Sequence, residues 1–183
     1  MRPATAYAAP DGAAVVRGDV LDAPFVARAI HGHDAVMSCL GIRYKHPWAQ
    51  RESPDDFISR STAHIVAGMK AAGLRRVNAI SAAGVADSRP ALNVVIRFLV
   101  ATSNVGVGYA DLARMEEVLR SSGLDWQAVR ATRLTGGAGT GKPRITRDFP
   151  VTANIARADV AAFMLAEIER PQFTERTPMI AAA

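Results

Sequence analysis

The stretch Asp34-Ala35-Val36-Met37-Ser38-Cys39-Leu40-Gly41 decides the fold, together with a similar stretch over residues 76–84. Both are apolar runs of strand length that end in small residues, and an earlier run, Val15-Val16-Arg17-Gly18-Asp19-Val20, reads as a strand followed by a tight turn. Near-continuous apolar strands are typical of a parallel sheet that is buried on both faces. Because helical patterns lie between the strands, we expect an α/β fold of Rossmann type. Its mostly parallel sheet would bind ligands at the carboxyl ends of the strands.

The expected elements follow from periodicity and from turn residues. Helices are expected where apolar residues recur at helical spacing, with Asp22 as the first N-cap and glycines at the helix ends. The region over residues 84–108 is ambiguous, because Pro90 and the glycines of 104–108 interrupt an apolar helical pattern at 92–101. Residues 135–150 are expected to form a loop with room for a short hairpin. The expected parallel strands are 13–17, 34–40, 76–81 and 126–130, with an edge strand at 178–181, and the expected helices are 22–31, 55–72, 109–121 and 157–169.

Bulk composition indicates one globular domain over residues 1–183. Hydrophobic residues make up 49% of the chain and charged residues 21%, which is an ordinary globular balance. No apolar run approaches the roughly 18 residues of a membrane span, so no membrane contact is expected. Cys39 is the only cysteine, which fits a reducing cytoplasm, and its place in an apolar strand predicts an inert, buried thiol.

The formal net charge is +5, and arginine supplies most of the positive charge. This favours anionic ligands, including phosphate groups. The arginines are scattered and aromatic residues make up only 6% of the chain, so there is no stacking platform and no nucleic-acid partner is expected.

Two glycine-rich stretches are candidate phosphate-binding sites. Residues 136–142 have the spacing of a P-loop, but Pro143 stands where a Ser or Thr hydroxyl must hold Mg²⁺, and no helix follows. We therefore expect a surface loop there. Gly106 and Gly108 precede a helix but lack a third glycine and a leading strand. The four histidines have no Cys or acidic residue at ligand spacing, so no metal site is expected.

The turn at Gly18-Asp19 has two interpretations. Its backbone N–H and carboxylate could meet an adenine ring, or Asp19 could be a local cap in a plain turn. The local residues favour neither interpretation.

Several short segments of the chain, spread over residues 13–170, follow a recognisable pattern. The strings Val16-Arg17-Gly18-Asp19-Val20-Leu21-Asp22, Leu40-Gly41, Ser81-Ala82-Ala83-Gly84, Ser122-Gly123-Leu124-Asp125-Trp126 and Arg157-Ala158-Asp159-Val160-Ala161 occur in order. With the segments at 33–36 and 110–119, they resemble the atypical short-chain dehydrogenase/reductase superfamily. The likeness is greatest to NmrA-like and biliverdin/flavin-reductase-like NAD(P)H-binding proteins, and it covers residues 13–170.

The resemblance implies a cofactor, NADP or NAD, and a set of residues around it. Gly18, Asp19 and Val20 would contact adenine. Leu40 and Gly41 would lie along the cofactor, Ser81 and Ala82 would lie near the nicotinamide, and Arg2 would meet a 2′-phosphate.

The resemblance also nominates Ser81 and Tyr109 as catalytic residues. The wider superfamily uses Tyr-x-x-x-Lys, whereas here Ala113 stands at the lysine position and residues 71–141 contain no lysine. Tyr109 is therefore expected to serve packing more than proton transfer.

The family pattern begins with a strand, a glycine-rich turn, a helix and a second strand. Met1-Arg2-Pro3 resembles the end of that second strand, so the resemblance implies that roughly forty residues of the pattern precede it. We expect upstream in-frame DNA to encode them, and we expect the chain as written to bind dinucleotide poorly. A gene-start error and a real loss both stay open.

The resulting expectation is an NAD(P)H-dependent oxidoreductase of the cytoplasm that acts on a small-molecule, flavin- or quinone-like acceptor. The alternatives are a non-catalytic NAD(P)-sensing or partner-binding module and an inactive truncated form. Exposed apolar strand edges would favour a homodimer.

Overall fold

The computed structural model describes residue 9 and residues 12–183. Their central sheet has the strand order β1-β2-β3-β7-β5, and a short parallel pair, β4 and β6, stands beside it. The strands are β1 (Ala35–Ser38), β2 (Arg76–Ala82), β3 (Asp125–Ala131), β4 (Arg133–Thr135), β5 (Pro143–Ile145), β6 (Asn154–Ala156) and β7 (Met179–Ala182).

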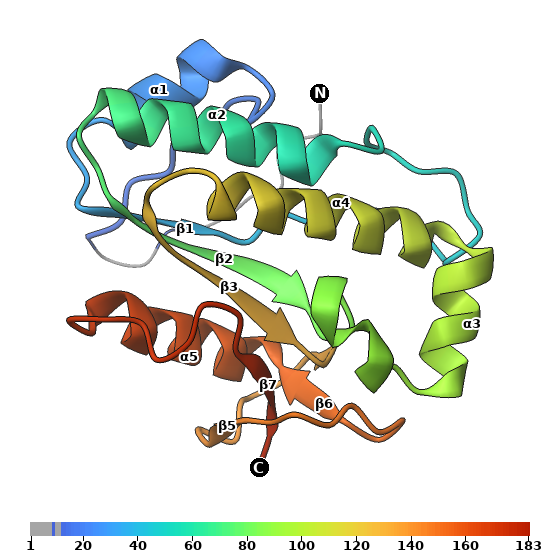
Figure 1. The fold of residues 1–183 in the computed structure, drawn as a ribbon. Coiled ribbons are helices and arrows are strands. Elements are labelled where there is room, and N and C mark those ends of the chain that lie inside the picture. Colours follow the sequence, from blue (N-terminus) through green and yellow to red (C-terminus); the bar gives the residue numbers. More distant parts are fainter. Residues whose placement is uncertain (1–8, 10–11) are drawn as a thin grey trace.

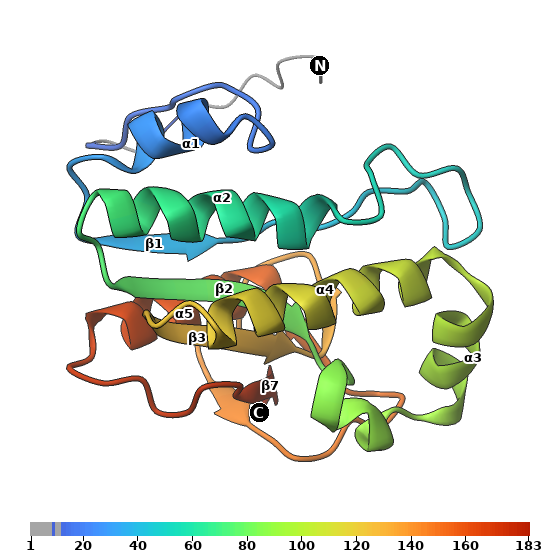
Figure 2. The same cartoon turned by 45° about the horizontal axis from the view of Figure 1, so that its top comes forward.

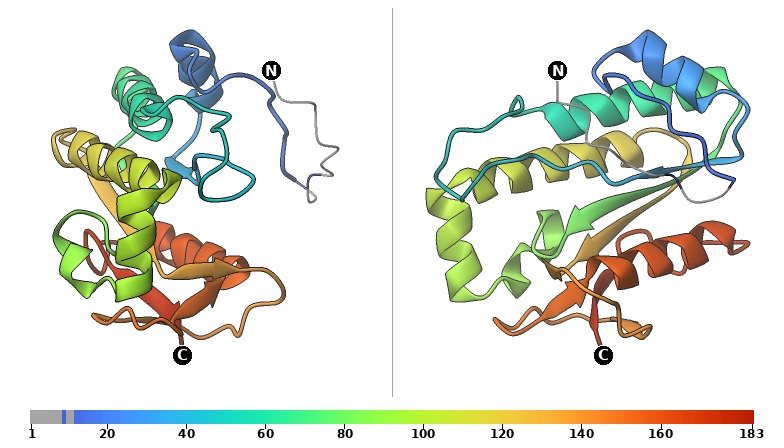
Figure 3. Two further views of the ribbon diagram at one scale, coloured as in Figure 1. Left: turned by 90° about the vertical axis from the view of Figure 1, so that its right-hand side faces the viewer. Right: turned by 180° about the vertical axis from the view of Figure 1, so that it is seen from behind.

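Helices cover both faces of this sheet. Helices α2 and α4 lie against one face, and α1 packs against α2 on the side away from α4. Helix α5 lies against the other face (Figures 1 and 3). A six-residue 3-10 helix, η1, and the short helix α3 follow β2 at one end of the sheet (Figure 2). The bounds are α1 (Ala23–Ile30), α2 (Phe57–Ala71), η1 (Ala86–Ala91), α3 (Val94–Thr102), α4 (Asn104–Arg120) and α5 (Arg157–Glu169).

The expected α/β fold with a mostly parallel sheet is confirmed. β1, β2, β3 and β7 are parallel neighbours, and only β5 runs antiparallel, against β7. The core is divided by the sheet. One cluster lies under α1, α2 and α4 around Met69 and Met115, and another lies under α5 around Ile155 and Met164.

The expected strand at 13–17 is wrong. These residues form no strand, and Val16 is 67% exposed. An isolated extended segment leaves its peptide groups to water unless a neighbouring strand pairs with it, and none of the described residues provides that neighbour.

The strand expected at 34–40 is shorter and less buried than its composition suggested. β1 is an edge strand, and Met37 is 36% exposed. Cys39, expected in the core, is exposed. An apolar run predicts burial on both faces only for an interior strand, and β1 has just one partner among the described residues.

Other boundaries also differ. Asn104 to Gly108 begin α4 and do not end a helix, and Ser103 caps α4 by accepting from the N–H of Val105. β7, expected at an edge, lies between β3 and β5. Asp22 stands at the N-cap of α1 without a side-chain capping bond.

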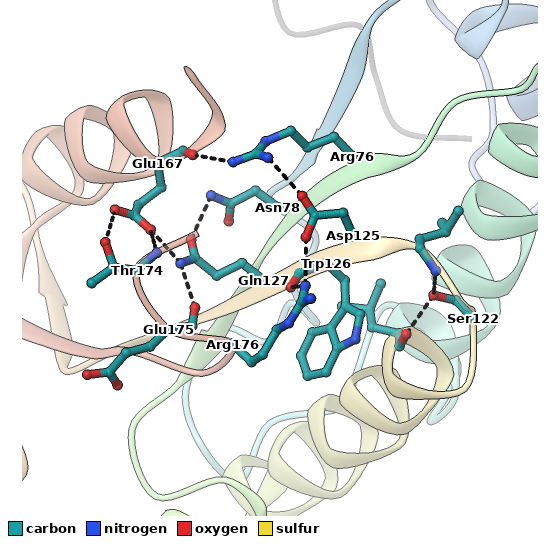
Figure 4. Close-up of polar contacts among 12 residues, drawn as sticks. Arg76, Asn78, Ser122, Asp125, Trp126, Gln127, Glu167, Thr174, Glu175 and Arg176 are labelled. Carbon is teal, nitrogen blue, oxygen red and sulfur yellow. Dashed lines mark hydrogen bonds and ion pairs between the residues drawn. The ribbon is translucent and has the colours of Figure 1, made fainter. Parts of the chain in front are cut away.

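Buried polar groups join β2, β3 and α5 near the amino ends of the strands (Figure 4). The Asn78 amide donates to Gln127 Oε1 at 3.1 Å, and the Gln127 amide donates to Glu167 Oε2 at 2.7 Å. Arg76 pairs with Asp125 at 2.8 Å and donates to the carbonyl oxygen of Glu167. These bonds satisfy polar groups that would be costly to bury alone, while Asn78 Oδ1 and Arg76 Nε have no hydrogen-bond partner among the described residues.

Candidate functional site

The opposite end of the sheet is where β1, β2 and β3 end, and it carries most of the expected site residues (Figure 1). Leu40 and Gly41 follow β1, while Ser81 and Ala82 end β2. A Cβ added at Gly41 would meet no atom within 4 Å. The strip after β1 is thus open surface on which a flat ring could lie.

Ser81 is tied into a buried charge network. Its hydroxyl donates to Glu116 Oε1 at 2.7 Å. Arg130 donates to both Glu116 oxygens, at 3.0 and 2.7 Å, and to Asp87 at 2.6 Å. Burial alone would lower the pKa of Arg130, but hydrogen bonds and charge attraction from Glu116 and Asp87 outweigh it and raise that pKa. The Ser81 hydroxyl therefore positions β2 against β3 and α4.

Tyr109 is anchored to the same end of β2. Its hydroxyl donates to the carbonyl oxygen of Ala83 at 3.0 Å. Burial, with a smaller contribution from nearby Tyr44, raises the pKa of Tyr109 to about 12. The structure thus brings Ser81 and Tyr109 to one end of the sheet, but each hydroxyl already has a partner within the protein.

The Gly18–Val20 turn is a local structure at the start of α1. Asp19 Oδ1 accepts from the Leu21 N–H at 2.9 Å, and the Val20 carbonyl oxygen lies 3.3 Å from His64 Nδ1. A Cβ at Gly18 would stand 2.2 Å from the Phe25 ring. Close packing therefore requires glycine here, and the local cap is the interpretation of Asp19 that the contacts support. Arg2 lies outside the described residues.

The glycine-rich loop over residues 136–142 holds an anion of the protein itself. Asp159, in the first turn of α5, accepts from the backbone N–H groups of Thr140 at 2.9 Å and Gly141 at 2.8 Å, and from the Thr140 hydroxyl at 3.1 Å. Successive N–H groups of this kind form an anion-binding nest. The expected surface loop is thus ordered around an internal carboxylate.

A long loop after β1 is fixed to α4. The Asn104 side chain accepts from Arg51 and donates to the Ala49 carbonyl oxygen. Asp111, which is fully buried, accepts from the N–H of Ile58 at 2.7 Å and from the Ser59 hydroxyl at 2.5 Å. A side chain of α4 therefore caps α2, and the loop is held beside the open strip.

Two adjoining clefts lie beyond the carboxyl ends of β2 and β3. The first, of about 550 Å³, lies between η1 and α3 and is lined by Arg89, Pro90, Leu92, Arg97, Val100 and Ala101. The second, of about 410 Å³, is more polar, with Asp87, Arg130, Arg147 and Glu175 among its lining residues. Pro90 lines both.

The model of an NAD(P)H-binding family matches residues 2–171. The chain belongs to this NAD(P)H-binding family. The expected relationship to NAD(P)H-binding proteins is confirmed.

Solved structures with the same fold agree. ChuY from Escherichia coli, an anaerobillin reductase, is 25% identical to this chain. The match covers 89% of this chain and 72% of ChuY, with a TM-score of 0.68. Another structure of ChuY from that species is 24% identical, and the match covers 90% of this chain and 74% of that one, with a TM-score of 0.67. A short-chain dehydrogenase/reductase of Veillonella parvula in complex with NADP shares the fold at 15% identity over 90% and 70%, with a TM-score of 0.68.

The residues present fit part of such a dinucleotide. Besides the open strip at Gly41, Thr132 follows β3 at the same edge, and its buried hydroxyl has no hydrogen-bond partner among the described residues. A group of this kind is typically satisfied by a ligand or by water. By contrast, the turns at Gly18 and at 139–141 are filled by Phe25 and Asp159. The turn at 139–141 therefore does not fit the pyrophosphate.

The sequence did not reveal three buried charged residues that hold the elements around this site together: Asp111, Glu116 and Arg130. They are charged residues in apolar patterns, which is itself a signal, because charged residues are rarely buried without partners. Their partners are distant in sequence and could not be identified from spacing.

Proposed function

We propose that this protein is an NAD(P)H-dependent reductase that reduces a small acceptor of the flavin or quinone type. Membership of the NAD(P)H-binding family carries the proposal. The likeness to ChuY, an anaerobillin reductase, supports it. The site lies at the carboxyl edge of the parallel sheet, which is where ligands bind in this class of fold.

In this proposal Leu40 and Gly41 lie along the cofactor, and Ser81 and Ala82 lie near the nicotinamide. The nicotinamide of NAD(P)H, when bound, supplies the hydride. Tyr109 fixes Ala83 and the turn after β2, and the proton that completes reduction of the acceptor comes from solvent. The Ser81 and Tyr109 hydroxyls act by positioning backbone.

The test uses the full chain in two steps. NADPH fluorescence is titrated with protein, and NADPH oxidation is then followed with menadione and with FMN as acceptors. Gly41→Leu should abolish both binding and oxidation, because its side chain fills the open strip. Gly136→Leu is the matched control, since a Cβ there also meets nothing within 4 Å but lies in the distant loop. Equal NADPH affinity in both variants would remove the assignment of this strip.

A second candidate is a non-catalytic NAD(P)-sensing module. The observation that favours it is that both candidate catalytic hydroxyls already have partners, with Glu116 and Ala83. Tight NADPH binding without oxidation by any acceptor would support the sensor and refute the reductase. Absence of NADPH binding would refute both for the chain as written and would support the inactive truncated form.

A further inference from the structure

The cleft between η1 and α3 has an apolar floor. Leu92 is buried, and it packs against the turn after β2, where a Cβ at Gly84 would lie 2.0 Å from Leu92 Cδ2. Gly84 also has a φ of +89°, which favours glycine. The turn therefore brings the floor of this cleft directly to the carboxyl end of β2.

One wall of the cleft is an unusually exposed apolar helix. None of the nine residues of α3 is buried, although most are apolar, and Val94 and Phe98 are 77% and 61% exposed. The helix is nevertheless held at both ends. Asn93 accepts from the Ile96 N–H at 3.0 Å and donates to Phe149, and the Trp48 indole donates to the Thr102 carbonyl oxygen at 3.0 Å. The structure thus holds an apolar surface open to solvent at the mouth of the cleft.

Two arginines line the cleft from different elements, Arg89 from η1 and Arg97 from α3. In the part of the chain that the structure describes, neither guanidinium has a hydrogen bond or an ion pair. Arg76, Arg130 and Arg176 all have acidic partners. Arg89 and Arg97 remain available to an anionic group, for which the guanidinium is well suited.

We propose that this cleft binds a small apolar organic anion, whose hydrocarbon part lies on Leu92, Val100 and Ala101 and whose acidic group pairs with Arg89 and Arg97. The cleft adjoins the end of β2 where Ser81 and Ala82 lie. The role of the cleft as the acceptor site rests on the proposed reductase function. Its binding of an apolar anion is independent of that function.

The test uses two fluorescent probes in the absence of cofactor. Anilinonaphthalene sulfonate carries an acidic group, and phenylnaphthylamine has the same rings without it. The sulfonate should bind the wild-type chain more tightly. Arg89→Gln and Arg97→Gln should each weaken its binding by about fivefold, a factor typical of one partly exposed charge pair. Neither substitution should change the binding of phenylnaphthylamine.

Arg60→Gln, at an exposed position of α2, is the matched control and should leave both affinities unchanged. A circular dichroism melt of each variant checks that all remain folded. Equal weakening in the control, or equal affinity for the two probes, would overturn the proposal.

Two further outcomes would also overturn it. If NADPH displaces the sulfonate, and both arginine variants lose NADPH affinity, the cleft is a site for the cofactor's phosphates. If the chain sediments with phosphatidylglycerol vesicles, and the arginine variants do not, α3 is a lipid-binding surface. Failure of reductase activity, with probe binding intact, would refute only the proposed function.

Discussion

The Tyr109 hydroxyl donates to a backbone carbonyl oxygen and has a pKa of about 12. At neutral pH it is a protonated phenol and a poor proton-transfer group. We therefore expect Tyr109→Phe to change the turnover of NADPH with menadione by less than about twofold, since general acid–base catalysis would contribute about a hundredfold or more. Tyr44→Phe is the control. A hundredfold loss in Tyr109→Phe alone would show that Tyr109 transfers the proton.

Glu116 has a larger structural role than the neighbouring Glu117. Both side chains pair with an arginine, but Glu116 is fully buried whereas Glu117 is exposed. Removing one partner of a buried ion pair leaves an uncompensated charge and costs about 3–5 kcal/mol. Glu116→Gln should lower the free energy of unfolding in urea by about 3 kcal/mol or more, and Glu117→Gln by less than about 1 kcal/mol. Equal effects would mean that the Arg130 network contributes little.

At the residue scale, the sequence could predict which residues end the strands but not the state of their side chains. The strand endings together with the family resemblance predict Leu40, Gly41, Ser81 and Ala82 at one sheet edge, and the four residues lie at that edge. That the Ser81 hydroxyl is bound to Glu116 depends on α4 packing on β2, a contact between distant segments. Exposure of Cys39 likewise depends on which strand pairs with β1.

Among the elements, the glycine-rich loop and α5 are linked by Asp159. A Cβ at Gly139 would stand 2.2 Å from Asp159 Oδ1, while at Gly136 it would meet nothing within 4 Å. Gly139→Ala should therefore displace the carboxylate and destabilise the fold by about 1–3 kcal/mol. Gly136→Ala should change stability by less than about 0.5 kcal/mol. Thermal melts followed by circular dichroism measure both, and equal melting temperatures would contradict the link.

Elements with a strong period were predicted well. The last helix begins and ends as expected at residues 157 and 169, and the strand expected at 126–130 is β3. The errors have two physical causes. The segment at 13–17 has strand composition but no partner in the described structure. Gly106 and Gly108 predict a helix break, although tertiary packing tolerates both glycines within α4. At Gly108 a Cβ would lie 3.0 Å from Ile42, so close packing explains the glycine.

For the molecule as a whole, three carboxylates make stability depend on pH. Hydrogen bonding to Arg130 lowers the pKa of Asp87, and the Thr140 N–H lowers that of Asp159. Burial alone would raise the pKa of Glu167, but bonds from Thr174 and Gln127 lower it overall. Each of these carboxyl groups has a lower pKa in the folded chain than in the unfolded chain. Its contribution to stability is therefore complete above the unfolded-state pKa and is lost as the pH falls through the folded-state pKa.

The urea midpoint should accordingly decrease as the pH is lowered from about 5 to 3, the range just above and below ordinary carboxyl pKa values. The double variant Asp159→Asn, Glu167→Gln should show a smaller decrease. A midpoint that stays constant over this range in the wild-type chain would contradict the prediction.

The outer edge of β1 bears on association. No described residue pairs with it, and exposed strand edges promote contact between chains. We predict that the chain associates with increasing concentration and that Met37→Lys, on this strand, reduces association. Leu165→Lys, at an exposed apolar position of α5, should not. Light scattering coupled to gel filtration measures the mass, and a monomer at all concentrations would refute the prediction.

Helix α4 makes the contacts of Asn104, Tyr109, Asp111 and Glu116, which reach a loop, the turn after β2, the start of α2 and the buried arginine. By contrast, η1 and α3 contribute Arg89, Arg97 and Phe98, for which the described structure shows no side-chain bond to the rest of the fold. Substitutions of these four α4 side chains should therefore cost stability, whereas substitutions of Arg89, Arg97 or Phe98 should cost little. Under the proposed function, this wall can therefore be altered to suit a different acceptor while α4 keeps Ser81 and Ala82 in place.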